Sequence, residues 1–395
     1  MAADPPAFER RALAWGVYGL VGYFGYLEAL LGPVMPFIRA EQDLGYTVAS
    51  LHFAAFAAGG VVAGGVADRL TARSGRQASL WGGAIGMLLG AGGIVAGPGP
   101  VATIAASLVM GTFGAVLLVT TQAALWDRYG DRSTIAVTES NIVASGCGMA
   151  ASVAVGSLSA TALGWRASVV PPLVALPVLF ATLKDRPLGV PRVVGHDRGS
   201  RLPMAFWTYF AVVFLGVAAE WCIGFWGATF LADAVALSAP AAAGAMGLFF
   251  GAMLVGRFAA SRAARRISGP SLLLGALLVA ALGFGALWLA PSAPVALGGL
   301  VLTGVGLSGV YPVGVSVAIA MAPSASDTAA ARLSIAAGSA MMLTPFAVGG
   351  LADAVGIGPA FALVWPVLVG AAIVAEAGRR TANAREGTRP EGVLR

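Results

Sequence analysis

The sequence predicts an all-α membrane protein with twelve transmembrane helices, arranged as two pseudo-symmetric six-helix bundles. First, 58% of the 395 residues are hydrophobic and only 11% are charged, whereas an average soluble domain has roughly 25% charged residues. Second, apolar runs recur along the whole chain at about the twenty-residue length that crosses a bilayer core. Third, the second half of the chain repeats landmarks of the first half, which predicts an internal duplication.

Charged breaks and breaks rich in proline and glycine separate the apolar runs. The predicted spans cover residues 13–37, 47–67, 78–97, 101–125, 134–160, 167–183, 204–232, 238–262, 270–290, 294–321, 329–351 and 357–377. A segment inside the bilayer must satisfy its own backbone hydrogen bonds, so each run is predicted to be a helix.

The basic residues indicate the orientation of these helices. If the N-terminus is cytoplasmic, all of the 24 lysine and arginine residues except Arg39 and Arg166 fall on the cytoplasmic side. Such a bias sets the topology of membrane proteins. We therefore expect a multi-pass protein of the cell (inner or plasma) membrane with both termini in the cytoplasm. Because the basic residues are spread over many short loops, the net charge of +6 does not indicate a nucleic-acid partner.

The repeat defines the predicted domains. Gly64 and Gly256 lie in similar glycine-rich segments at an offset of 192 residues, and Gly156 and Gly350 correspond at an offset of 194. A polar segment separates the two copies and is typical of a linker. The predicted parts are an N-terminal bundle, a cytoplasmic linker, a C-terminal bundle and a cytoplasmic tail, at residues 1–183, 184–203, 204–377 and 378–395.

Two glutamates occupy matching positions in the two copies. Glu28 lies in the middle of the first predicted span, and Glu220 lies in the middle of the seventh, 192 residues later. Charged groups at this depth are costly and usually functional. Glu28 shares a helical face with Gly25 and Gly32, and Glu220 shares one with Gly216 and other glycines. Small residues mark the faces on which membrane helices pack together, so both carboxyl groups are expected to point inward.

The segment Gly64-Gly65-Val66-Ala67-Asp68-Arg69, followed by Gly75-Arg76, resembles the loop between helices 2 and 3 of the major facilitator superfamily. The departure from the family pattern is the insertion of residues 70–74. The resemblance covers nearly the whole chain and implies a carrier that alternates between inward-open and outward-open states.

The resemblance also implies a gating site on the cytoplasmic side. Its residues would be Asp68, Arg69, Gly75 and Arg76, with Asp127 at the end of helix 4 as a further partner. The alternative is that these are ordinary interfacial charges that set the topology.

The sequence favours transport that is driven by an ion gradient. Lys184 is the only lysine, and no nucleotide-binding loop precedes it. Because burial disfavours the charged form of a carboxyl group, Glu28 and Glu220 are the candidate proton-coupling residues. The alternatives are that a protonated glutamate only joins helices by hydrogen bonds, or that one glutamate alone binds protons.

Further candidate residues come from the helices that the resemblance places around a central cavity, which are helices 1, 4, 7 and 10. Gln122, Ser308 and Tyr311 are candidates for hydrogen bonds to a solute. Tyr26 and Trp221 are candidates for stacking on it, although such aromatic residues also fill cores and anchor membrane interfaces.

Glu139 belongs to the same list of proton-coupling or substrate residues, but its sequence position leaves two interpretations open. It lies seven residues after Arg132, on the same helical face. An ion pair at the membrane interface therefore explains it equally well.

The expected partners are a small solute, protons and the lipid bilayer, with the chain acting as a monomer. Since no arginine or lysine is predicted near the bilayer midplane, organic anions are disfavoured as substrates, and acidic groups beside aromatic rings favour a cationic or neutral solute. No metal-ligand spacing and no converging nucleophile and base occur, so no cofactor, metal or enzymatic activity is expected.

The direction of transport is predicted from a proline and glycine pattern. Antiporters of the resembled family often have Gly-Pro-x-x-Gly-Gly in helix 5, and here a similar pattern runs from Pro345 to Gly350 in helix 11. Export by proton antiport is the resulting prediction. The alternatives are a proton-coupled importer of a sugar or similar nutrient, and a membrane sensor that transports nothing.

Overall fold

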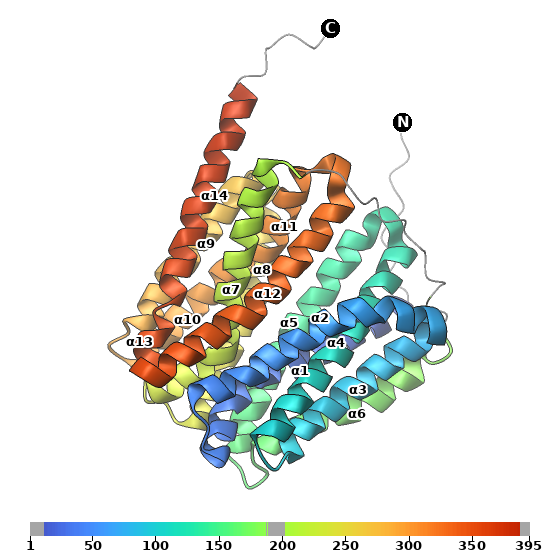
Figure 1. Ribbon diagram of the computed structural model, residues 1–395, viewed down its shortest axis with the longest axis vertical. Helices are drawn as coiled ribbons and strands as arrows, with labels where there is room; N and C mark the ends of the chain where they lie inside the picture. The colour runs from blue at the N-terminus through green and yellow to red at the C-terminus, as the bar shows by residue number, and fades with distance from the viewer. Residues whose placement is uncertain (1–11, 187, 189–201, 388–395) are drawn as a thin grey trace. The chain divides into compact units, whose positions relative to one another are not determined.

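The computed structural model describes residues 12–186, 188 and 202–387 (Figure 1). Twelve helices in this part of the chain are long and apolar enough to cross a membrane. This confirms the predicted all-α membrane fold.

The helices of the first half are α1 (Ala12–Gln42), α2 (Tyr46–Ser74), α3 (Arg76–Ala96), α4 (Pro100–Tyr129), α5 (Ser133–Ser159) and α6 (Val170–Leu183). Those of the second half are α7 (Met204–Asp233), α8 (Ala239–Ala263), α9 (Gly269–Trp288), α10 (Ala293–Leu307), α11 (Val310–Ala320), α12 (Ser326–Val355), α13 (Ile357–Phe361) and α14 (Val364–Gly387). Short 3-10 turns lie at η1 (Gly130–Arg132), η2 (Trp165–Val169) and η3 (Pro323–Ala325).

Two spans differ from the prediction in an informative way. Helix α2 continues to Ser74, seven residues past the predicted end at residue 67, so most of the segment that was expected to be a loop is helical. It ends at Gly75, whose φ of 81° favours glycine. The tenth span is one apolar run in the sequence but is interrupted between α10 and α11.

The internal repeat extends to the backbone conformation. Corresponding elements begin 192 to 194 residues apart, as with Ala12 and Met204, or Val170 and Val364. Before η2, Gly164 has φ 70° and ψ 171°, and before α13, Gly356 has φ 81° and ψ 161°. This region of φ and ψ is accessible essentially to glycine alone. The same backbone turn therefore recurs at an offset of 192 residues.

The chain forms two compact units by its contacts. The first contains Met1–Leu31 and Ala55–Val193, and the second contains Gly32–Ala54 and Val194–Arg395. The second unit thus includes the end of α1 and the start of α2. The predicted domain boundaries follow the repeat instead of these contacts, and they stay a prediction.

Close contacts between neighbouring helices stabilise each unit internally. In the first unit, a side chain at Gly90 of α3 would collide with the backbone of Met110 in α4. In the second unit, where α7 lies beside α12 (Figure 1), the buried Trp226 of α7 donates a 2.8 Å hydrogen bond from Nε1 to the Pro345 carbonyl. Small residues such as Gly90 let membrane helices approach closely.

Candidate functional site

The second unit brings Glu220 together with polar residues from two other spans. We call Glu220, Arg257, Ser308 and Tyr311 the Glu220 cluster. Glu220 is half-buried in the middle of α7, and it interacts electrostatically with Arg257 of α8 and with Tyr311 of α11. Gly256 faces the Ser308 side chain, so α8 and the end of α10 are in close contact beside Arg257. Three predicted site residues therefore lie in one neighbourhood.

Arg257 is not among the residues predicted to form a site. No basic residue was predicted near the buried carboxyl groups, and Arg257 was counted with the basic residues of the cytoplasmic side. In the structure it lies within α8, six residues before the end of the helix at Ala263. An arginine side chain is long enough to reach from there toward the middle of the span. Its charge acts on Glu220. The preference for a cationic or neutral solute stays a prediction.

The interruption of the tenth span lies next to this cluster. Helix α10 ends at Leu307, and α11 begins at Val310. Pro312 explains the break, because a proline lacks an N–H and its ring clashes with the carbonyl group four residues earlier, which here belongs to Ser308. Broken membrane helices expose backbone groups at the substrate sites of several transporters.

The individual side chains of the cluster have different roles. Ser308 is buried, and its hydroxyl donates a 2.6 Å hydrogen bond to the carbonyl of Val305 in its own helix, which is a local structural role. Tyr311 is 40% exposed although it lies inside a span. Trp221 is half-buried, and its ring centre lies 4.9 Å from that of Phe225. Of the three, Tyr311 has the most accessible polar group.

A second polar group of residues was not predicted as a site. We call Arg39, Tyr46, Asp233 and Asp353 the outer cluster. Arg39 of α1 forms a 2.9 Å ion pair with Asp233 at the end of α7, and the Tyr46 hydroxyl donates to the same carboxylate at 2.9 Å. The Arg39 guanidinium lies 3.7 Å from the centre of the Tyr46 ring. Asp353 of α12 accepts hydrogen bonds from the backbone of Tyr46 and Thr47 at 2.7 and 2.9 Å.

An aromatic layer lies beneath the outer cluster. The ring of Phe53 in α2 is stacked on Phe225 at 4.3 Å, and it meets Trp226 edge-on at 5.3 Å. Close contacts flank this layer: a side chain at Gly32 would collide with the carbonyl of Gly224, and one at Gly349 would approach the carbonyl of Tyr46 to 2.8 Å. The start of α2 and the end of α1 are therefore packed tightly on α7 and α12.

In the first unit, two of the predicted gating residues, Arg76 and Asp127, are in contact. Arg76 is buried and forms a 2.7 Å ion pair with Asp127 of α4, and it also donates to the Leu188 carbonyl at 2.7 Å. Gly75 provides the turn that places Arg76 at the start of α3. Arg69 lies exposed on α2, and the side chain of Asp68 lies outside the described residues. The gating role of these residues stays a prediction.

The remaining candidates of the first unit lie on three helices. Glu28 of α1, Gln122 of α4 and Glu139 of α5 are all half-buried. Glu139 accepts a 3.0 Å hydrogen bond from the hydroxyl of Tyr18, a residue that sequence reasoning did not single out. Tyr26 is buried, and its hydroxyl donates to the Ser168 carbonyl at 2.8 Å, so this polar group is already used within the fold.

Comparison with known proteins gives a consistent picture of the fold. The model of the family described as Major Facilitator Superfamily matches residues 14–292. The crystal structure of a bacterial homologue of the human lysosomal transporter Spinster, inward-facing and unoccupied, has a TM-score of 0.70 at 16% identity, over 95% of this chain and 98% of that one. A mutant of the peptide transporter POT gives 0.73 at 13% identity, over 94% of both chains. The comparison with curated proteins gave no match.

Proposed function

Because this chain belongs to the Major Facilitator Superfamily, we propose that it is a proton-coupled secondary transporter that exports a small cationic or neutral organic solute by alternating access. Family and fold make it a multi-pass membrane transporter and not an enzyme. The cell membrane as its location, cytoplasmic termini and a monomeric state are parts of the proposal.

The electrostatic interaction between Glu220 and Arg257 carries this proposal. Burial disfavours an ionised carboxylate, and a nearby positive charge favours it, so the two influences on Glu220 oppose each other. A carboxyl group in such a balance can gain or lose a proton when its surroundings change. The exposure of a buried carboxyl group to water changes when a carrier opens and closes. This change would make Glu220 the proton-binding residue.

The charges of the pair favour exchange of a proton for a cation. With Glu220 ionised, the pair with Arg257 is neutral, and a bound cation brings the net charge to about +1 by counting charges. With Glu220 protonated, the site has that charge already, and a cation would add to it. Since excess charge is costly in the membrane, the proton and the cation would bind alternately, which is antiport.

The same pair supports a second candidate function. With Glu220 protonated, the positive charge of Arg257 is no longer offset by that carboxylate and can attract an organic anion. Proton and anion would then bind together, which is symport. This alternative differs from the sugar import expected from the sequence, and the electrostatic interaction of Arg257 with Glu220 supports it.

Glu28 and the outer cluster have supporting roles in the proposal. Glu28 occupies the position in α1 that corresponds to Glu220 in α7, and we assign it a second proton or the positive group of the solute. The outer cluster joins the ends of α1 and α7 and the start of α2, and we assign it the role of holding these segments together within the second unit.

Proton release on substrate binding tests the proposal. Purified protein in weakly buffered detergent solution is titrated with ethidium, a sugar and a dicarboxylate, and the pH is followed. Ethidium should release protons, and Glu220→Gln should abolish the release. Glu376→Gln is the matched control, because Glu376 pairs with Arg379 and Arg380 in α14.

Flux in proteoliposomes with an imposed pH gradient gives the second measurement. Ethidium movement against the proton flow supports antiport, and dicarboxylate movement with the protons supports the second candidate. If no solute moves in either direction and no proton is released, proton-coupled transport of these three classes of solute is excluded. The proposed export of a cation would then be wrong.

A further inference from the structure

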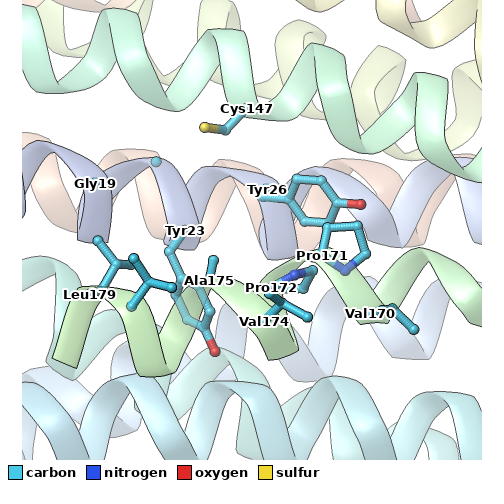
Figure 2. Close-up of a pocket in the computed structure, with 12 residues that line it drawn as sticks. Gly19, Tyr23, Tyr26, Cys147, Val170, Pro171, Pro172, Val174, Ala175 and Leu179 are labelled. Atoms are coloured by element: carbon cyan, nitrogen blue, oxygen red, sulfur yellow. The ribbon is translucent and has the colours of Figure 1, made fainter. Parts of the chain in front are cut away.

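A pocket of about 640 Å³ lies within the first unit, between α1, α5 and α6. Figure 2 shows Tyr23 and Tyr26 projecting from α1, Cys147 on α5, and the side chains from Val170 to Leu179 along α6. The volume is within the range of about 300 to 1,000 Å³ typical of small-molecule sites. None of the residues of the Glu220 cluster lines it, so it is a separate feature.

The wall of the pocket is apolar even at its tyrosines. The Tyr23 hydroxyl donates to the Ala84 carbonyl at 3.0 Å, and the Tyr26 hydroxyl donates to the Ser168 carbonyl at 2.8 Å. Both rings therefore offer only carbon atoms to the pocket. Water gains no hydrogen bonds from such a wall, and apolar cavities of even about 150 Å³ stay dry and bind apolar molecules.

The mouth of the pocket lies on the side where α6 is exposed. Val170, Val174 and Val178 line the pocket and are 51%, 61% and 59% exposed. They belong to a helix that is apolar and long enough to cross the membrane. An opening at this place leads into the hydrocarbon region of the bilayer, where acyl chains are the surrounding medium.

The length and the charges of α6 fit one lipid molecule. From Val170 to Lys184 the helix rises about 21 Å at 1.5 Å per residue, which matches the roughly 20 to 22 Å of one leaflet with its headgroup region. Lys184 and Arg186 are exposed at the end of the helix, with Asp185 between them, so the local net charge is positive. A phosphate group would be attracted to this end.

We propose that this pocket binds one acyl chain of a membrane phospholipid, with the phosphate at Lys184 and the chain end at Tyr26 and Cys147. The prolines of α6 favour such a gap. Pro177 lies inside α6 and removes one backbone hydrogen bond, while Pro171 and Pro172 line the pocket at the start of the helix. The bound chain would replace the van der Waals contacts that the open wall lacks.

Photo-crosslinking tests this proposal in nanodiscs made with the whole protein. One phosphatidylglycerol probe has a diazirine near the acyl carbonyl, and a second has it near the methyl end. After irradiation, the first should label α6 near Leu179, and the second should label Tyr26 or Cys147. The reverse order, or labelling of the outer surface of α6 without residues of α1, would overturn the proposal.

A substitution that fills the pocket provides a second test. Ala175→Phe places a ring in the pocket, whereas Ala181→Phe adds the same ring at an exposed position of the same helix. Labelling of α1 by the methyl-end probe should fall at least fivefold in the first variant and stay unchanged in the second. Undiminished labelling in Ala175→Phe contradicts the proposal. If that variant does not fold, Val174→Trp at the exposed rim serves the same purpose.

Discussion

The carboxylate of Asp353 caps the helix that begins at Tyr46, 307 residues earlier in the chain. It accepts hydrogen bonds from the first two backbone N–H groups of α2, at 2.7 and 2.9 Å. These groups have no partner within their own helix, and the N-terminus of a helix favours negative charge. Asp353 lies in the last turn of α12, where its own helix disfavours a negative charge. The cap on α2 offsets that cost.

Removal of this cap should loosen α2 from α12. A helix cap contributes about 1 kcal/mol, which is about a fivefold change in an equilibrium. Ser50 is buried against Gly349 of α12, so a thiol introduced by Ser50→Cys reports on separation of the two helices. In a background with Cys147→Ser and Cys222→Ser, we expect Asp353→Ala to raise the rate of labelling by a membrane-impermeant maleimide about fivefold.

Asp353→Asn is the matched control for the cap. Its side-chain oxygen can still accept one of the two hydrogen bonds, so its labelling rate should lie between those of the parent and Asp353→Ala. Equal rates in all three proteins would mean that the cap does not hold the helices together.

The ion pair of Arg39 and Asp233 should show measurable coupling. The two side chains are 17% and 37% exposed, and partly exposed pairs typically contribute about 0.2 to 1 kcal/mol. A double-mutant cycle with Arg39→Ala and Asp233→Asn, read by the same thiol at position 50, should give a coupling energy in this range. Strict additivity of the two substitutions would show that the pair contributes nothing.

Neutral substitution of both charges in the Glu220 cluster should separate stability from function. Glu220→Gln alone removes the negative charge that acts on Arg257 in a low-dielectric site, which is unfavourable. The double variant Glu220→Gln with Arg257→Gln should therefore unfold at a higher temperature than Glu220→Gln alone, as measured in detergent. Neither variant should release protons when ethidium is added. A double variant that is less stable than both single variants would argue against the contact.

Alanine at the two repeated glycine turns should destabilise the protein through the backbone alone. Gly164 and Gly356 have positive φ, and a methyl group at either position would meet no atom within 4 Å. Each substitution should therefore cost about 1 to 3 kcal/mol from backbone strain. Thermal unfolding in detergent measures the loss. Gly275→Ala in α9 also meets open space but lies in a helix, and it should be neutral or slightly stabilising.

Much of the fold follows from local sequence patterns. Apolar length fixes the spans and the basic residues predict orientation, because both depend on the exchange of water for lipid at each position. The two exceptions to the basic pattern have specific partners in the structure: Arg39 pairs with Asp233, and Arg166 donates to the Val95 carbonyl at 3.0 Å. Glu220 was identified because the repeat linked it to Glu28.

The parts that sequence reasoning missed depend on contacts between distant segments. No pattern linked Tyr46 to Asp353 or Tyr18 to Glu139, since these contacts arise only when helices pack. Arg257 lies near the end of a predicted span, and its sequence position alone does not relate it to Glu220. Pro312 was a stronger signal, because a proline in an apolar span predicts the break that separates α10 from α11.

The matched turns at Gly164 and Gly356 also bear on how the two halves of the chain diverged. Two of the four residues before each turn are alanine in both copies and the four residues after it all differ, whereas the positive-φ backbone conformation is the same in both. A change at either glycine is restricted by geometry and not by any contact, so neither copy could lose it gradually. Residues of this kind preserve the record of an ancient duplication after the surrounding sequence has lost it.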